Sequence, residues 1–387
     1  MVSSPRGFDV SEYQGRVNRA QTLMGEVGLD AILLTTEPDF RYFTGFLTRF
    51  WESPTRPWFL IVPASGDPVC IIPSIGAALM AQAWVEDVRT WQSPDLVDDG
   101  VSLLAQTLRD VVGASGRVGL PSGSATHLRM PLADYARLKG ELDPIELEGD
   151  AEIMQRLRLV KSDAEIAKIR SACQIADRAF ARVPEIAAVG RPLDDVFRRF
   201  QMLCLEEGAD NVPYLAGAAG QGGYGDVISP ATAELLMVGD VLMLDTGLTH
   251  DGYFCDFDRN FAIDTVSAEA ASAHAKLIDA AAAGMDAAKP GATAADLFRA
   301  MDQIVTGGSG TSAVGRLGHG LGMQLTEWPS LIPEDQTELC DGMVLTLEPS
   351  IEVGAGRMLV HEENIVIRCG GAEFLSTPSG PAMAAIE

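Results

Sequence analysis

Four acidic residues in the C-terminal half stand inside or beside apolar runs that would otherwise be buried strands. They are Asp245 after Val241–Leu244, Asp256 within residues 252–257, Glu348 after Met343–Leu347 and Glu362 just before Asn364–Ile367. A buried carboxylate without a partner is costly, so each needs a cation, a proton or several hydrogen-bond donors. Two divalent metal ions would satisfy all four carboxylates at once.

A fifth candidate ligand is His319, which lies in a segment with glycines at positions 318, 320 and 322. Glycine lets the backbone approach a ligand closely, and neutral imidazole is a common metal ligand. An oxygen-rich set with one imidazole suits manganese, our first choice, or cobalt, zinc or iron. Two such ions about 3.5 to 4 Å apart lower the pKa of a shared water and polarise the bond that it attacks. Hydrolysis is the natural reaction of such a site.

Each of these side chains alone is more often a cap, a salt bridge or a turn residue than a metal ligand. Their joint occurrence in one half of the chain carries the prediction, and the surrounding elements must bring them together. In the first 150 residues, helical and strand patterns alternate, as in an α/β domain. Apolar residues recur at helical spacing over 13–27, a strand follows at 31–36, and apolar runs at 58–62 and 69–72 flank a turn.

A helix start marks the second part of the chain. Ser162 and Glu165 have the spacing of a capping box, and an apolar stripe follows them up to Pro184. We therefore predict two domains, residues 1–155 and 156–387. In the second, helices at about 192–208, 267–287 and 294–306 alternate with apolar strands near 241–247, 252–262, 343–351 and 358–368. Their hairpin-like order predicts an antiparallel sheet backed by helices, an α+β plan.

Composition excludes several function classes. The 54 acidic and 29 basic residues give a net charge of −25, which repels nucleic acid and anionic lipid surfaces. The chain has no apolar run of about 18 residues and no signal-peptide pattern, so we expect a cytoplasmic protein without membrane or nucleic-acid partners. Its six scattered cysteines form no CxxC pair, and we expect free thiols.

The order of these motifs resembles the pita-bread metallohydrolases, a family that includes aminopeptidase P, prolidase and methionine aminopeptidase. The matching segments are Asp245-Thr246-Gly247, Asp256 with Arg259, the glycine-flanked His319, Leu347-Glu348-Pro349, and Glu362 ahead of a strand. In addition, Asp39–Phe46 is similar to the smaller creatinase-like N-terminal domain of prolidase-like members. The resemblance implies a pita-bread catalytic domain, two metal ions, a small peptide or amino-acid-derived substrate and a homodimer.

The resemblance also implies a role for each ligand. Asp245 would bind one metal, Asp256 and Glu362 would bridge both, and His319 and Glu348 would hold the other. Glu348 would also act as general base toward the attacking water. Glu363 is the alternative to Glu362.

The chain departs from the peptidases at two positions. They carry a histidine seven residues after the metal-binding histidine, where this chain has Thr326, and another about 17 residues before the first aspartate, where it has Ile228-Ser229-Pro230. Candidates to replace these imidazoles are Thr326, which we count as catalytic, and Glu327, Ser229 and Tyr224.

These departures leave the reaction open among three readings. The first is an Xaa-Pro dipeptidase or aminopeptidase that cleaves a C–N bond. The second is a creatinase-like or ectoine-hydrolase-like amidohydrolase, or a dimethylsulfoniopropionate lyase, which resembles this chain at Glu327-Trp328-Pro329. The third is a binding module without catalysis, against which the complete ligand set argues.

The substrate pocket is predicted from aromatic residues. Residues 50–58 form a proline-stiffened segment, and in dimeric relatives the small domain reaches the partner's active site. We therefore expect Trp51, Arg56 and Trp58 to bind substrate across a dimer, with packing on their own domain as the alternative. Tyr224 and Trp328 complete the predicted substrate-binding set.

Overall fold

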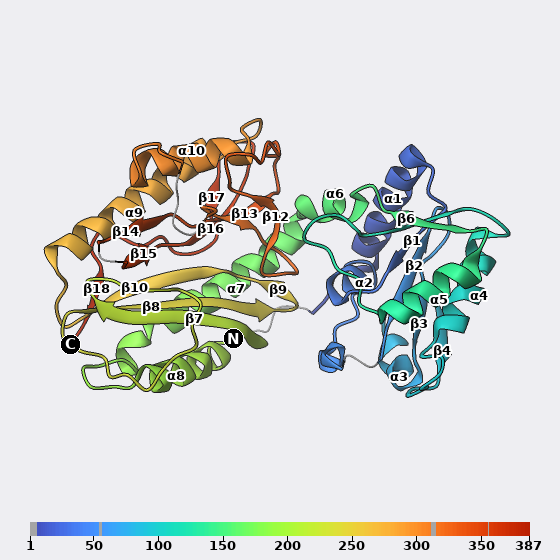
Figure 1. Ribbon diagram of the computed structural model, residues 1–387, viewed down its shortest axis with the longest axis horizontal. Coiled ribbons are helices and arrows are strands. Elements are labelled where there is room, and N and C mark those ends of the chain that lie inside the picture. Colours follow the sequence, from blue (N-terminus) through green and yellow to red (C-terminus); the bar gives the residue numbers. More distant parts are fainter. Residues whose placement is uncertain (1–5, 54–55, 311–314, 355) are drawn as a thin grey trace. The chain divides into compact units, whose positions relative to one another are not determined.

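The computed structural model describes residues 6–53, 56–310, 315–354 and 356–387. The chain divides into two compact units between Arg158 and Leu159. Unit 1 contains β1–β6, α1–α5 and all of α6 except its last residue, and unit 2 contains the later elements (Figure 1). Among the described residues, no helix is both long and apolar enough to cross a membrane. All six cysteines are free thiols, four of them buried.

Unit 1 is built on a six-stranded mixed sheet of order β4-β3-β2-β1-β5-β6. The strands are β1 (Ala31–Leu34), β2 (Phe59–Pro63), β3 (Val69–Pro73), β4 (Asp87–Trp91), β5 (Arg117–Leu120) and β6 (Glu146–Gly149). The turn at residues 64–68 joins β2 and β3 as an antiparallel pair, as the apolar runs predict. The runs of β1, β2 and β3 are buried on both faces because helices cover both sides of the sheet.

The helices of unit 1 supply these two covers. They are α1 (Val10–Val27), α2 (Glu37–Thr44), α3 (Ala77–Met80), α4 (Val101–Val112), α5 (Leu132–Leu142) and α6 (Ile153–Leu159). Helices α4 and α5 pack with alternate residues of β1 and β2 in one apolar core, and α1 packs against α2 and β2 outside that core. One 3-10 turn, Arg49–Glu52, follows α2.

Unit 2 contains two larger sheets and one small hairpin. The first has the order β18-β10-β8-β7, with β9 paired to β8, and the second has the order β12-β11-β13-β16-β17. The strands are β7 (Asn211–Gln221), β8 (Asp240–His250), β9 (Tyr253–Phe254), β10 (Phe257–Ile263), β11 (His319–Gly320), β12 (Glu327–Ser330), β13 (Val344–Leu347), β14 (Ser350–Glu352), β15 (Met358–Val360), β16 (Glu363–Val366), β17 (Glu373–Phe374) and β18 (Ala384–Ile386). Most pairs are antiparallel, and within the described ranges β14 pairs with β15 alone.

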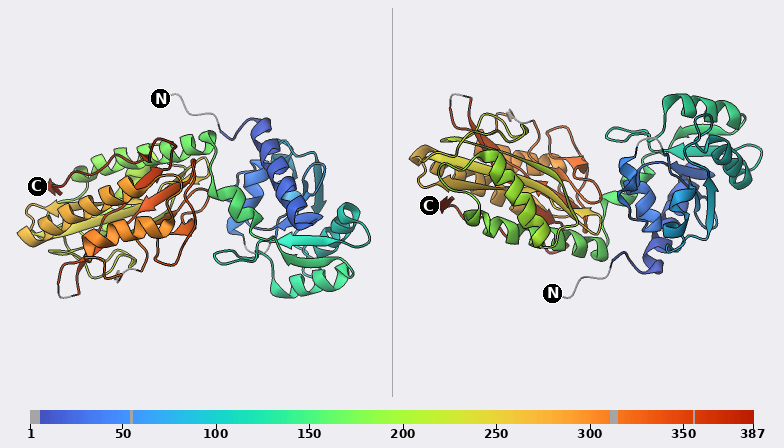
Figure 2. Two further views of the ribbon diagram at one scale, coloured as in Figure 1. Left: turned by 90° about the horizontal axis from the view of Figure 1, so that it is seen from above. Right: turned by 90° about the horizontal axis from the view of Figure 1, so that it is seen from below.

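Two pairs of helices cover these sheets. Helices α7 (Asp163–Ala181) and α8 (Leu193–Glu206) contact β8 and β7, whereas α9 (Ala268–Ala287) and α10 (Ala294–Val305) pack on β13, β14 and β15 (Figures 1 and 2). Helix α7 begins at the predicted capping box, because Ser162 accepts from the Glu165 N–H and Glu165 accepts from the Ser162 N–H. The stripe on α7 ends at Phe180, whose ring packs on Phe257 of β10 at 5.3 Å between centroids.

Three of the strands predicted as continuous are interrupted, and each interruption falls at a candidate ligand. Asp256 lies between β9 and β10, Glu348 between β13 and β14, and Glu362 between β15 and β16. At these points the backbone leaves the regular ladder, so the carboxylates need not follow the alternation of a flat strand.

Candidate metal centre

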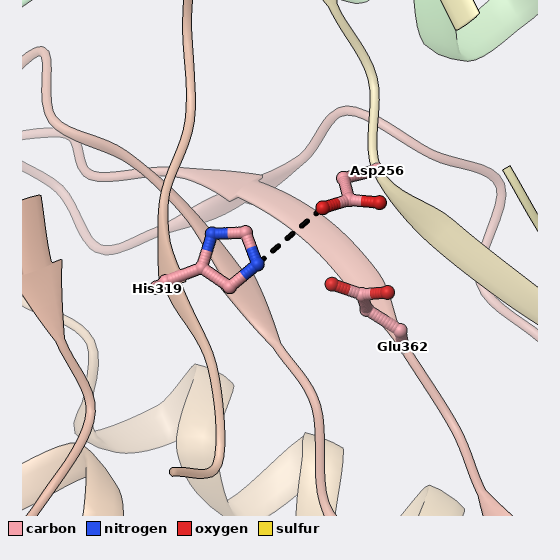
Figure 3. Close-up of side chains that lie close together, drawn as sticks. All are labelled: Asp256, His319 and Glu362. Carbon is pink, nitrogen blue, oxygen red and sulfur yellow. Dashed lines mark ion pairs between the residues drawn. The ribbon is translucent and has the colours of Figure 1, made fainter. Parts of the chain in front are cut away.

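Three of the five predicted ligands form one buried cluster. Ligand atoms of Asp256, His319 and Glu362 all lie within 4.8 Å of one another (Figure 3). The side chains come from three different strands or strand ends and are 4%, 2% and 2% exposed. Two carboxylates and an imidazole therefore converge in the interior of unit 2.

Two glycines allow His319 to enter this cluster. Gly318 has φ +138°, and a Cβ there would lie 2.3 Å from the carbonyl oxygen of Thr346. A Cβ on Gly320 would lie 1.9 Å from the carbonyl oxygen of Trp328. The His319 N–H donates to Thr346 Oγ1 at 3.1 Å. Any side chain at either glycine position would push the histidine-bearing segment away from the neighbouring strands.

Side chains from distant strands hold the other two ligands at their interrupted positions. The Asp256 N–H donates to Asn364 Oδ1 at 3.0 Å, and the Asn364 amide donates back to the Asp256 carbonyl. The Glu362 N–H donates to Asp258 Oδ1 at 2.7 Å, and its carbonyl accepts from Arg259 at 3.0 Å. These bonds replace the ladder hydrogen bonds that the strand breaks remove.

The ring of His319 is oriented as a metal ligand would be. Its Nδ1 lies 2.8 Å from the Gly320 carbonyl oxygen, which can only accept, so Nδ1 carries the proton. Burial, followed by the Arg316 charge, lowers the pKa of His319 to about 4, so the ring is neutral near pH 7. The lone pair of Nε2 then faces Asp256 Oδ2 at 3.4 Å (Figure 3). Two lone pairs at this distance call for a cation between them.

Asp245 and Glu348, the other two predicted ligands, interact electrostatically with this cluster. Burial raises the pKa of Asp245 well above its ordinary value, and the Asp256 charge adds to the effect. Burial raises the pKa of Glu348 to about 7, where the His319 interaction opposes it and the charges of Asp245 and Asp256 reinforce it. The Glu348 N–H donates to the Leu317 carbonyl at 2.9 Å, two residues from His319.

The four carboxylates fit a pair of divalent cations. Burial also raises the pKa of Asp256 and of Glu362. The charges of the acidic residues around Glu362 raise the pKa of Glu362 further. Asp245 Oδ1 and Glu362 Oε1 are buried and have no hydrogen-bond partner among the described residues. Buried carboxylate oxygens that lack hydrogen-bond donors repel one another, and a bound metal ion removes this repulsion. Metal binding is common for such groups of carboxylates.

The neighbouring residue Glu363 is not part of this cluster. It pairs with Arg259 at 2.9 Å, accepts from Ser376 and from the Ser379 N–H, and lies 3.1 Å from His361 Nε2. Burial alone would raise its pKa, but the Arg259 charge and the bonds from His361 and Ser376 lower it to about 2. Glu362, rather than the alternative Glu363, lies with Asp256 and His319.

Thr326 lies at the edge of the site with an arginine. It is exposed, and its Oγ1 accepts from Nη2 of the half-buried Arg316 at 3.3 Å. The next residue, Glu327, is buried and paired with Lys161 at 3.0 Å, so it anchors β12 instead of facing solvent. Ser229 donates a hydrogen bond to Asp226 and has no described contact with the cluster.

The predicted substrate-binding residues of unit 2 lie in different surroundings. Tyr224 is only 2% exposed, and its hydroxyl accepts from the Val360 N–H at 2.7 Å and bonds Asn260 at 3.2 Å. It is a core residue, because its short segment pairs with Met358 of β15. Trp328 is half-buried on β12, beside the strand that carries His319, and its indole N–H has no partner among the described residues.

The two tryptophans of unit 1 that we expected to bind substrate across a dimer are buried within their own domain. Trp51 and Trp58 are 6% and 1% exposed and pack 5.5 Å apart between ring centroids, both in contact with Phe40. Their own domain provides the apolar neighbours, as the alternative interpretation held. Arg56 stays half-buried over the Phe50 ring, and residues 54 and 55 lie outside the described residues.

Two residues near the centre were missed by the sequence analysis. Tyr214, on β7, interacts electrostatically with Asp245, and its strand is rich in alanine and glycine and carries little strand signal. Burial and the Asp245 and Asp256 charges raise the pKa of Tyr214, so the phenol keeps its proton. Arg316 could have been noticed as a basic residue three positions before His319 in a strongly acidic chain.

Comparisons with known proteins match each of the two units to a protein family. The profile of metallopeptidase family M24 matches residues 167–368, and that of the creatinase/prolidase N-terminal domain matches residues 16–160. The chain is 28% identical to the probable dipeptidase PepE of Mycobacterium tuberculosis over 368 residues, which cover 94% of this chain and 93% of that protein. It is 27% identical to the Xaa-Pro dipeptidase of Pyrococcus horikoshii over 253 residues, 64% of this chain and 71% of that protein. The crystal structure of dipeptidase PepE from Mycobacterium ulcerans superposes with a TM-score of 0.83 at 26% identity, covering 98% of this chain and 99% of that one.

Proposed function

This chain belongs to metallopeptidase family M24, and from that premise we propose that it is a dinuclear-metal dipeptidase that cleaves the C–N bond before proline. The family, the hydrolase class and the expected fold, a pita-bread catalytic domain after a creatinase-like domain, are confirmed by the matches. The observation that carries the finer proposal is the convergence of Asp256, His319 and Glu362, together with buried carboxylate oxygens that have no hydrogen-bond partner in the described part of the chain.

The proposed metal ligands are Asp245, Asp256, His319, Glu348 and Glu362, and manganese is the first candidate metal. When bound, two divalent ions supply the Lewis acidity that lowers the pKa of water and polarises the scissile carbonyl. His319 suits this role because its neutral ring directs Nε2 at the carboxylates. Tyr214, which interacts with Asp245 from the neighbouring strand β7, would orient that ligand.

Glu348 is the proposed proton carrier. Burial raises the pKa of its carboxyl, and two bound divalent ions would oppose that rise and keep Glu348 ionised, so that it can accept a proton from water. As water oxygen adds to the peptide carbonyl carbon, Glu348 accepts the water proton. It returns the proton to the nitrogen as the C–N bond breaks, which releases an amino acid and proline.

The test is a substrate screen with the purified full-length protein. Enzyme supplied with Mn²⁺ or Co²⁺ is incubated with Ala-Pro, Ala-Ala and Ala-Pro-Ala, and released amino acids are quantified. We expect Ala-Pro to be cleaved with the highest kcat/KM. Turnover of creatine, an ectoine derivative or a sulfonium compound without cleavage of Ala-Pro would replace the dipeptidase proposal with the corresponding alternative. Solvent oxygen-18 in the product distinguishes hydrolysis from elimination.

A further inference from the structure

Arg316 brings a positive charge to the edge of the acidic centre. Burial raises the pKa of Asp256 and of Glu348, and the charge of Arg316 opposes that rise. Burial lowers the pKa of His319, and the Arg316 charge adds to that effect. The guanidinium therefore interacts electrostatically with all three side chains. The same arginine takes no part in the proposed hydrolysis. It is therefore a charged group at the site without an assigned role.

The backbone next to Arg316 is fixed on two sides. The Leu317 N–H donates to the Leu331 carbonyl at 3.0 Å, and the Leu317 carbonyl accepts from the Glu348 N–H at 2.9 Å. The segment thus lies between the end of β12 and a proposed metal ligand. An arginine on such a segment starts from a defined point beside Glu348.

The guanidinium itself is only lightly engaged. Its Nη2 donates to Thr326 Oγ1 at 3.3 Å, and among the described residues it forms no ion pair with a carboxylate and no second hydrogen bond. Arginine has five N–H donors, so most of them face solvent or a ligand. Lys161, by contrast, lies in the same part of unit 2, and its ammonium group is held in a buried ion pair with Glu327.

Charge counting shows what is missing. The four carboxylates of the centre carry a formal charge of about −4, which two divalent cations neutralise. The positive charge of Arg316 then has no counter-charge in the centre. A guanidinium cannot serve as acid or base near neutral pH, but its planar fork matches a carboxylate.

We propose that Arg316, held by Thr326, binds a carboxylate of the substrate and selects molecules with a free carboxylate next to the scissile bond. For the dipeptidase proposed above, on which this inference rests, that group is the C-terminal carboxylate of the dipeptide. Amidated dipeptides and longer peptides lack a carboxylate at this place. Arg316 is thus a specificity-determining residue, and Thr326 is a positioning residue.

The experiment compares Ala-Pro with Ala-Pro-amide in the wild type and in Arg316→Gln. We expect the wild type to prefer the free carboxylate in kcat/KM by about 10- to 100-fold, the range of a charge-assisted hydrogen bond. The Gln variant should lose this preference, because its kcat/KM falls further for Ala-Pro than for the amide, mainly through a higher KM for Ala-Pro. Thr326→Val should reduce the preference by a smaller factor. An undiminished preference in Arg316→Gln overturns the inference, as does a wild type without preference.

Two further variants keep the result interpretable. Arg198→Gln is the matched control, because the Arg198 side chain on α8 is 68% exposed and its pair with Asp195, at 4.0 Å, is a weak one. This variant should cleave both substrates as the wild type does. If Arg316→Gln does not fold, Arg316→Lys decides. The lysine keeps the charge without the fork, so a reduced preference supports the inference and an unchanged one overturns it.

A binding measurement separates this inference from the proposed function. If the wild type cleaves neither substrate, the dipeptidase proposal fails, and calorimetric titration of the Mn²⁺-loaded protein with L-proline and L-prolinamide decides about Arg316. Tighter binding of L-proline that Arg316→Gln removes supports the carboxylate site. Equal binding of the two compounds by the wild type, or none, overturns it.

Discussion

Glu362 and Glu363 are adjacent in the chain and chemically identical, yet their surroundings are opposite. Glu362 lies with Asp256 and His319, and burial and four acidic neighbours raise its pKa. Glu363 lies against Arg259, and its pKa is lowered to about 2 despite burial. Glu362 lies in the interruption before β16 and Glu363 is the first residue of that strand, so one step along the backbone exchanges an environment of acids for one of donors.

The comparison shows two ways in which one fold accommodates buried carboxylates. On the Glu363 side the chain provides every partner itself: a guanidinium, an imidazole, a hydroxyl and a backbone N–H. On the Glu362 side, Oε1 is left without a partner among the described residues. A self-satisfied network indicates a structural role, and an unsatisfied one indicates that a ligand from outside the chain completes it.

The largest effect should follow removal of a carboxylate from the unsatisfied side. Glu362→Gln deletes a proposed shared ligand, and loss of even an outer partner of a metal site costs about 10- to 100-fold, so we expect at least about a hundredfold loss of kcat/KM. Elemental analysis should find less bound metal than in the wild type. Chelation of the wild type should abolish activity in the same way, and added Mn²⁺ should restore it. Unchanged metal content with activity near the wild type would break the comparison.

Glu363→Gln should have the reverse signature, with lost stability and retained metal. The pair with Arg259 is buried, with side chains 2% and 12% exposed, and loss of one partner of such a pair costs about 3 to 5 kcal/mol. Denaturant unfolding measures this loss. The control is Glu373→Gln, because its pair with Arg170 is exposed and should contribute about 0 to 1 kcal/mol. Metal loss in Glu363→Gln comparable to that in Glu362→Gln would show that the two sides are not separate.

A change of pH should sharpen the comparison by acting on the Glu363 side. His274, on α9, is 3% exposed and packs against His361 at 6.0 Å between ring centroids. Burial, followed by the His361 charge, lowers its pKa from 6.5 to about 4. Between these values the unfolded chain binds a proton that the folded chain does not, so stability falls as pH drops from 6.5 to 4, by up to about 3 kcal/mol.

The measurement is the difference in unfolding free energy between the wild type and His274→Gln across this pH range. The variant should lose less stability than the wild type on acidification. His127→Gln, at an exposed position of unit 1, is the control for a general effect of removing a histidine. A wild-type slope that His274→Gln leaves unaltered would contradict the assignment.

The sequence was sufficient for the four helices of unit 2, α7 to α10, and for the conflict between apolar runs and carboxylates that marks the ligands. The capping box at Ser162 is a local device, and a local pattern predicts it. Carboxylates in apolar runs are visible without coordinates. The interruptions at Asp256 and Glu362 were not predictable, because Asn364 and Asp258 cause them from distant positions by bonding to the backbone.

The burial of Trp51 and Trp58 and the position of Tyr214 near the site also depend on tertiary contacts. The pattern around Trp51 and Trp58 is the same for an interface loop and for a packed one, and Phe40 decides between them. Strand β7 has too many alanines and glycines for a propensity signal and is defined by its pairing with β8. Tyr214 was therefore outside the predicted site, and Tyr224, which has the same chemistry, was placed in it.

These two tyrosines allow the smallest and most selective test of the comparison. Tyr214→Phe removes the hydroxyl that interacts with Asp245 and should lower the affinity for Mn²⁺ by about tenfold, at the lower end of the effect of an outer-shell change. The loss of stability should be small because Tyr214 is only half-buried. Tyr224→Phe removes an equivalent hydroxyl in the core, leaves the Val360 N–H unpaired, and should cost about 1 to 3 kcal/mol of stability at unchanged Mn²⁺ affinity. Calorimetric Mn²⁺ titration and denaturant unfolding of both variants give four values, and the prediction is that each variant changes only one of its two. If Tyr224→Phe weakened Mn²⁺ binding as much as Tyr214→Phe, the unsatisfied centre would extend into the core of unit 2, and the boundary drawn between Glu362 and Glu363 would have to move.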